Sequence, residues 1–272
     1  MPRETLLDFF DENINSSNIF LVYEGVYRSY SYTYTEVRDA AHCFASRLCK
    51  AGIRPQDNVV LWGENRPEWI VAFWGCLIAK AVAVPVDIQA SSKFVSRIRH
   101  IVSARVVVAG SELPTHMISG AEIWKLEDLF KSIRESAEQK CKTQSEISGN
   151  DLVEIIFTSG ATAEPKGVQI THNNILANIV PVEQEVLKYL PYSRTFFPLR
   201  FLNLQPLSLL FGHALSTFIP PMFQGTTVFV RGHNPDEIVS QVKRRRISVI
   251  VCVPKILEVL RDYLEARVPE LS

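Results

Sequence analysis

The sequence lacks a charge surplus and a long apolar run, and each absence excludes a class of protein. Its 272 residues carry 29 basic and 29 acidic side chains, so no basic excess is present to neutralise nucleic-acid phosphates. The longest apolar stretch, 69–86, is interrupted by Lys80 and Pro85 and falls short of the ~20 residues of a membrane-spanning helix. The amino terminus carries charges too early for a signal peptide. We expect a cytoplasmic protein with no nucleic-acid partner and no transmembrane segment, though peripheral contact with a membrane stays compatible with this.

The cysteines form no recognisable framework. They are odd in number and contain no C-x-x-C pair, which fits reduced thiols better than disulfides or a zinc site. Cys76 and Cys252 lie in apolar runs, where small buried hydrophobes are expected. The full set is Cys43, Cys49, Cys76, Cys141 and Cys252.

Hydrophobic periodicity predicts strands and helices in alternation. This order is typical of an α/β fold in which helices cover largely parallel sheets. The predicted strands are 58–62, 82–86, 105–109, 152–157, 167–170, 226–230 and 248–253, and the predicted helices are 35–51, 67–79, 91–103, 172–189, 236–245 and 256–266. No internal repeat is present.

Two polar stretches interrupt this pattern or lie at the end of one of its helices. Residues 131–150 are predicted to form an exposed connector between a first portion, 1–130, and a second portion, 151–272. The basic run 243–246 ends a predicted helix that begins with Asp236 and Glu237. Because these charges complement the helix dipole at both ends, we interpret the run as a solvated helix end.

The segment 157–168, FTSGATAEPKGV, follows a predicted strand directly and holds hydroxyls, glycines and a lysine. Such a loop can hold phosphate through backbone N–H groups, hydroxyls and a lysine charge. Composition alone leaves a tight hairpin turn equally open. Spacing excludes a P-loop, because Pro165 stands where the second glycine belongs and Gly167, not Ser or Thr, follows Lys166.

Residues 157–175, FTSGATAEPKGVQITHNNI, closely resemble the phosphate-binding signature of the acyl-adenylate-forming superfamily, the AMP-dependent synthetases and ligases. That signature reads [YF]-T-S-G-[ST]-T-G-x-P-K-G-V, followed by T-H-x-N. Three further segments, 31–87, 204–229 and 247–260, are similar to the same family in order and spacing. The P-L-S-x-x-F-G and F-I-P-P wording looks most like long-chain fatty acid–CoA ligases.

The resemblance implies the N-terminal domain of the acyl-CoA synthetase/luciferase-like fold and a two-step reaction. A carboxylate attacks the α-phosphate of Mg-ATP to give acyl-AMP and pyrophosphate, and coenzyme A then takes the acyl group. Position by position, the ATP phosphates would be bound by Thr158, Ser159, Gly160, Ala161, Thr162, Lys166 and Gly167, with Thr162 as a neighbour of magnesium. The acyl and adenylate pocket would include Leu209, Phe211 and Gly212.

This chain departs from the family pattern at three positions. Ala161 replaces a Ser or Thr, Ala163 replaces a glycine, and Leu209 replaces a histidine that lies beside the acyl carboxylate. No catalytic residue is therefore assigned. His213, one helical turn later, is expected to be an ordinary histidine in a polar or partly exposed setting. The apolar segment 196–223 is a candidate acyl tunnel, although apolar segments more often form core.

Three functions remain open. The first is the N-terminal part of an acid–thiol ligase, because the family's Y-G-x-T-E motif, ribose-binding aspartate and late lysine do not occur in these residues. The second is a non-catalytic remnant or binding module with the same fold, and the third is an adenylation domain of peptide synthesis. On any of them we expect negligible turnover by this chain alone, and self-association through incomplete sheet edges.

Overall fold

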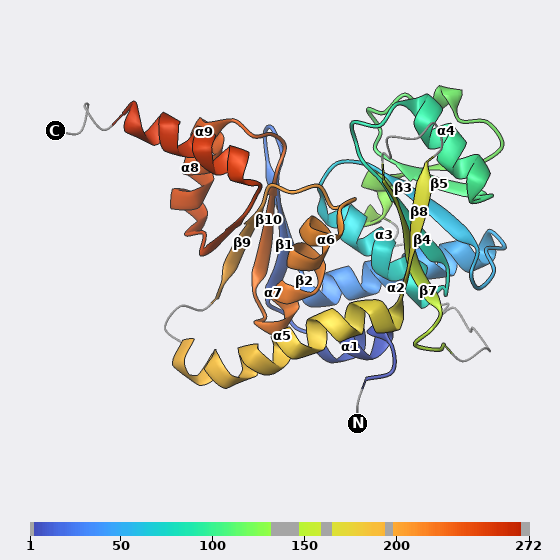
Figure 1. The fold of residues 1–272 in the computed structure, drawn as a ribbon, viewed down its shortest axis with the longest axis horizontal. Helices are drawn as coiled ribbons and strands as arrows, with labels where there is room; N and C mark the ends of the chain where they lie inside the picture. Colours follow the sequence, from blue (N-terminus) through green and yellow to red (C-terminus); the bar gives the residue numbers. More distant parts are fainter. Residues whose placement is uncertain (1–2, 132–146, 159–164, 194–197, 268–272) are drawn as a thin grey trace.

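The computed structural model describes residues 3–131, 147–158, 165–193 and 198–267. Two sheets stand apart, with helices between them and on their outer sides (Figure 1). The first sheet has the order β11-β9-β10-β1-β2 and the second the order β6-β5-β3-β4-β7-β8. The strands are β1 (Ile19–Glu24), β2 (Ser29–Thr33), β3 (Asn58–Trp62), β4 (Val82–Val86), β5 (Val106–Ala109), β6 (Glu122–Lys125), β7 (Leu152–Thr158), β8 (Lys166–Thr171), β9 (Arg200–Asn203), β10 (Thr226–Val230) and β11 (Val249–Val251).

The helices connect parallel strands, as expected for crossovers in an α/β fold. Neighbouring strands run parallel in every described pair except β1–β2 and β7–β8, which confirms the predicted fold class. The helices are α1 (Leu6–Asn13), α2 (Tyr34–Lys50), α3 (Pro67–Ile78), α4 (Ser92–Ile101), η1 (Thr115–Met117), η2 (Leu126–Asp128), α5 (His172–Ser193), α6 (Leu210–Thr217), α7 (Ile219–Met222), α8 (Pro235–Arg245) and α9 (Pro254–Glu265).

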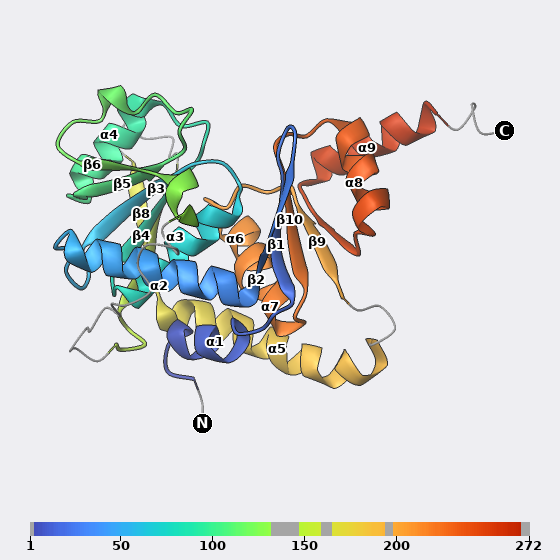
Figure 2. The same ribbon diagram turned by 180° about the vertical axis from the view of Figure 1, so that it is seen from behind.

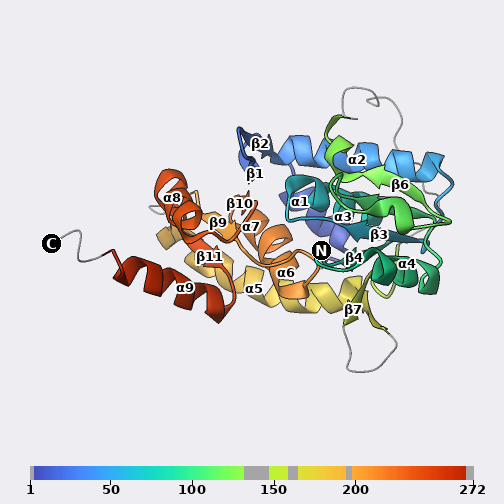
Figure 3. The ribbon, with the colours of Figure 1, turned by 90° about the horizontal axis from the view of Figure 1, so that it is seen from above.

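The sheets are apolar on both faces because both faces are covered. In β3, Val59 and Leu61 join the central core, whereas Val60 and Trp62 join the core beneath α4. On the other sheet, α8 and α9 cover the outer face, where Val228 packs with residues of both helices. Figure 3 shows these two helices at the end of the molecule opposite α4.

Helix α3 lies in the middle of the central core. Every residue from Pro67 to Leu77 is buried, because α2 covers one side of the helix and the strands of the second sheet another (Figure 2). Helix α3 matches the predicted helix 67–79 and includes the first part of the apolar stretch 69–86. Within the described residues, no helix is long and apolar enough to span a membrane.

Local signals explain where the helices start. Thr33 accepts a hydrogen bond from the Glu36 N–H, and Glu36 accepts one from the Thr33 N–H at 2.7 Å, which forms a capping box for α2. Asn234 caps α8 in a similar way through the Asp236 N–H.

The basic end of α8 is not simply solvated. Arg244 and Arg245 each donate to the buried carboxylate of Glu24 in β1, at 2.7 Å. The helix was predicted correctly, and Arg244 is solvated as expected, with 56% of its side chain exposed. The interpretation missed that both side chains also pair with Glu24. They neutralise a carboxylate that the sheet has taken out of water.

Cys49, half-buried near the end of α2, is disulfide-bonded, so the prediction of reduced thiols is wrong at this position. Spacing gave no signal because a disulfide depends on neighbours in space. Cys43, Cys76 and Cys252 are free. Most of the predicted connector, 132–146, lies outside the described residues. Each sheet contains strands that precede the connector and strands that follow it. The division into portions 1–130 and 151–272 stays a prediction.

Candidate adenylate site

The signature segment joins the two strands of a hairpin. Strand β7 ends at Thr158, β8 begins at Lys166, and these two residues are partners in the antiparallel ladder. Lys166 is exposed at the base of the turn. Ser159, Gly160, Ala161 and Thr162 lie outside the described residues, so their predicted contacts with phosphate stay predictions.

Gly167 is required by packing at this base. A Cβ atom on Gly167 would lie 2.7 Å from Cγ2 of Ile155 and 3.1 Å from Cζ of Phe157. These contacts are shorter than van der Waals separation, so a larger residue would push β8 away from the side chains of β7. The glycine thus keeps Lys166 close to the strand that carries Thr158.

The second predicted segment enters α6 through a turn held by Asn65. The Asn65 amide donates to the Gln205 carbonyl at 2.6 Å and accepts from the Leu207 N–H at 2.8 Å. Gly212 allows this turn to close, because a Cβ atom there would lie 2.4 Å from the Pro206 carbonyl oxygen. Asn65, which lies two residues before α3, therefore serves a turn distant in the chain.

Leu209 and Phe211 face outward at the start of α6. Leu209 is 48% exposed and Phe211 61% exposed. Leu209 occupies the cap position and makes no side-chain cap, and its alkyl group offers no hydrogen bond to a carboxylate. The two side chains present an apolar surface rather than a polar contact.

His213 is buried, so the prediction of a polar or partly exposed setting is wrong. Its backbone N–H donates to the Leu209 carbonyl at 2.9 Å, which confirms the one-turn spacing. The ring packs against Phe73, with centroids 4.2 Å apart, and Nδ1 lies 3.5 Å from Oε2 of the fully buried Glu154 in β7. Within the described residues, neither side chain has a hydrogen-bond partner. This contact joins strand β7, which precedes the signature loop, to helix α6, which holds Phe211 and Gly212 of the predicted acyl pocket.

A cleft of about 130 Å³ opens where strands of both sheets reach their carboxyl ends. Its lining includes Asn65, Asp87, Ser208 and Arg231. Ser208 donates to Asp87 at 3.3 Å. Ligands of open α/β sheets bind at such strand ends, and the location next to residues 205–212 makes this cleft the described part of the candidate pocket.

The sequence had partial signals for this cleft. Asp87 ends the segment 31–87 that resembles the family, but no pocket role was predicted for Asn65, Ser208 or Arg231. They come from different elements, and only the meeting of the two sheets brings them together. Among the described residues, no group of three or more His, Cys, Asp or Glu side chains forms a metal site.

The two sheets, the hairpin and the cleft form the fold of the N-terminal domain of adenylate-forming enzymes. The family model of the AMP-binding enzyme matches residues 13–271. The chain belongs to this family.

Solved structures agree on the fold. O-succinylbenzoate coenzyme A synthetase (MenE) from Bacillus subtilis, in complex with AMP, aligns with a TM-score of 0.75 at 20% identity, over 96% of this chain and 64% of that one. The fatty acyl-adenylate ligase from L. pneumophila, in complex with acyl adenylate and pyrophosphate, aligns with a TM-score of 0.72 at 20% identity, over 92% of this chain and 44% of that one.

Among curated relatives, the D-alanine–D-alanyl carrier protein ligase of Listeria monocytogenes is 27% identical over 198 residues. The match takes in 72% of this chain and 37% of the relative. The chain thus spans well under half the length of this relative. The names of these similar proteins include three different carboxylic acids.

Proposed function

We propose that this chain supplies the ATP-phosphate hairpin and part of the acid pocket of an ATP-dependent acid–thiol ligase. The observation that carries the proposal is the β7–β8 pairing. It brings the two ends of the signature together and holds Lys166 opposite Thr158. A lysine at this place adds a charge for the phosphates held by the turn.

The proposed reaction joins a carboxylate to the α-phosphate of ATP and releases pyrophosphate. Negative charge grows on the departing pyrophosphate, and the ammonium of Lys166 would stabilise it together with donors of residues 158–162. Magnesium would enter with the nucleotide phosphates, with Thr162 as its proposed neighbour. Transfer of the acyl group to coenzyme A would follow.

A fatty acid is the proposed acid. The P-L-S-x-x-F-G sequence at 206–212 supports a fatty acid. The exposed apolar side chains of Leu209 and Phe211 support it as well, because they suit contact with an acyl chain better than contact with a charged amino group. An adenylation domain of peptide synthesis is the second candidate, supported by the carrier protein ligase among the relatives. Leu209 supplies no contact for the carboxylate, which favours the third candidate, a non-catalytic remnant.

The first experiment measures ATP binding to the purified chain by calorimetry. Lys166→Ala is expected to weaken ATP affinity by about tenfold, since one phosphate contact is worth ~1.4 kcal/mol or more. Lys188→Ala is the matched control, because Lys188 is an exposed lysine that pairs with Glu185 on α5. If wild-type chain binds no ATP, or if both variants bind it equally well, the proposed phosphate site is wrong.

The second experiment measures acid-dependent exchange between ATP and pyrophosphate, with fatty acids of several lengths and with amino acids. We propose that the chain alone gives negligible exchange, since a dispersed site loses far more than additively when groups are missing. Robust exchange would contradict that, and the acid that supports it would decide between the candidates. Cytoplasmic location, peripheral membrane contact and self-association stay predictions.

A further inference from the structure

A larger cavity lies away from the signature hairpin and from α6. Its volume is about 840 Å³, and it opens between the β1–β2 turn, the start of α3 and the residues that follow η2. Within the described residues it shares only Arg231 with the lining of the adenylate cleft. Pockets for small molecules commonly measure ~300–1,000 Å³, so the cavity has the size of a ligand site.

Aromatic rings form one wall of this cavity. Tyr32 stacks on Phe130 with ring centroids 3.7 Å apart, and Tyr27 at the turn is 95% exposed. Burial raises the pKa of Tyr32 to about 12 and also raises the pKa of Tyr23. The phenols are therefore neutral at physiological pH, and their ring faces attract cations. The lining rings are Tyr23, Tyr27, Tyr30, Tyr32 and Phe130.

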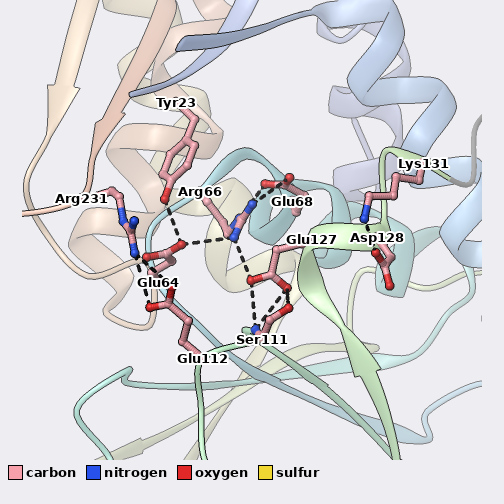
Figure 4. Close-up of polar contacts among 10 residues, drawn as sticks. All are labelled: Tyr23, Glu64, Arg66, Glu68, Ser111, Glu112, Glu127, Asp128, Lys131 and Arg231. Carbon is pink, nitrogen blue, oxygen red and sulfur yellow. Dashed lines mark hydrogen bonds and ion pairs between the residues drawn. The ribbon is translucent and has the colours of Figure 1, made fainter. Parts of the chain in front are cut away.

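The floor of the cavity carries more negative than positive charge. Figure 4 shows the Arg66 guanidinium in the middle of three carboxylates. It donates to Glu68 at 2.8 Å, to Glu127 at 2.9 Å and to Glu64 at 3.1 Å. Two of these carboxylates, Glu68 and Glu127, line the cavity beside Arg66, whereas Glu64 lines the adenylate cleft. The Arg66 side chain is only 11% exposed.

Hydrogen-bond partners shift the pKa values of Arg66 and Glu127 toward the charged forms. Burial alone would lower the pKa of Arg66, but the hydrogen bond and charge of Glu68 raise it. Burial would likewise raise the pKa of Glu127, but N–H and O–H donors of Ser111 lower it. Both shifts favour the charged forms of Arg66 and Glu127.

The mouth of the cavity carries the opposite charge. Arg28, Lys131 and Arg231 line it. Lys131 pairs with Asp128 at 2.7 Å and Arg231 with Glu112 at 3.4 Å (Figure 4). Arg28 is exposed, and its side chain makes no hydrogen bond or ion pair with the described part of the chain.

We propose that this cavity binds a small zwitterion of the arginine type, with its cationic end against Glu68 and Glu127 and its carboxylate near Arg28. Burial decides the orientation. The floor carboxylates are largely shielded from solvent ions, whereas the mouth charges are exposed and screened. A cation is therefore drawn to the floor between the aromatic rings, and an anionic end is left at the mouth.

Calorimetry with arginine and agmatine tests both ends of the ligand, because agmatine keeps the guanidinium and lacks the carboxylate. Glu127→Gln is expected to lower the affinity for both ligands by about tenfold, because a partly buried unit charge is lost. The carbonyl oxygen of the substituted amide can still accept from Ser111, so the loop stays supported. Arg28→Ala is expected to weaken the binding of arginine and to leave the binding of agmatine unchanged.

Glu122→Gln and Arg54→Ala, exposed changes elsewhere on the surface, are matched controls and are expected to bind both ligands as wild type does. Lys166→Ala should also leave arginine binding unchanged, which separates this site from the proposed ATP site. The proposal is overturned if arginine does not bind at millimolar concentration. It is also overturned if Arg28→Ala weakens both ligands equally, or if phosphate binds in place of arginine.

Discussion

Replacing His213 alone should destabilise the chain far more than replacing His213 and Glu154 together. The imidazole and the carboxylate lie 3.5 Å apart with almost no exposure to solvent. Trp69, Phe73 and Phe218 surround the ring at centroid distances of 5.0, 4.2 and 5.2 Å. Each polar group therefore depends on the other for compensation.

The magnitudes follow from what each change leaves behind. His213→Leu leaves a buried carboxylate with no partner, which costs about 3–5 kcal/mol. Glu154→Leu leaves a buried imidazole with no polar partner, which costs about 1–3 kcal/mol. The double leucine variant removes both polar groups and is expected within about 1 kcal/mol of wild type, because apolar replacement of a buried pair is often neutral. With a double variant as stable as wild type, the coupling energy should be about 4–8 kcal/mol.

Urea unfolding followed by tryptophan fluorescence measures these free energies. The exposed pair Arg38 and Asp11, 3.3 Å apart, supplies a control cycle with an expected coupling below about 1 kcal/mol. If the Glu154–His213 cycle gives a coupling as small as this control, the two side chains do not compensate each other and the reasoning fails.

Three further changes test other contacts. Burial lowers the pKa of His172 from 6.5 to about 4, so stability should fall as pH drops from 6.5 toward 4, by ~1.4 kcal/mol per unit; a His172→Gln variant with the same pH slope in urea unfolding would contradict this. Gly212→Ala forces a Cβ against the Pro206 carbonyl and should cost about 1–3 kcal/mol, so an unchanged melting temperature would rule out the close approach. Ile250→Lys on the edge strand β11 should reduce self-association measured by light scattering, and no change in apparent mass would exclude that edge.

The sequence predicted the elements whose signals are local. Strands β3, β4 and β10 and helix α2 lie within a residue of their predicted limits, because apolar runs and caps are written in neighbouring residues. Strands β1, β2, β6 and β9 were not predicted. Strands β2, β6 and β9 are short or carry mixed polarity, whereas β1, IFLVYE, is an apolar run that was missed. Strand β1 pairs with β10, far along the chain.

The candidate site follows the same division. The signature loop is contiguous, so one stretch of sequence identified its family, and the pairing of Thr158 with Lys166 agrees with it. The cleft beside it is assembled from separate loops. Asn65 illustrates this, since it lies two residues before α3 but its amide bonds to the backbone of residues 205 and 207.

His213 does not take the place of the family histidine that Leu209 replaces, although it lies only one helical turn away. A side chain at 213 points into the central core, where rings of α3 enclose it, so its imidazole faces Glu154 rather than a ligand. A carboxylate in the cleft would have to be held by groups that line it. Among the described lining residues, Arg231 is the arginine or lysine side chain. Because Arg231 also lines the zwitterion cavity, occupancy of that cavity would alter the charge offered to the acid, which links the two proposed sites through one side chain.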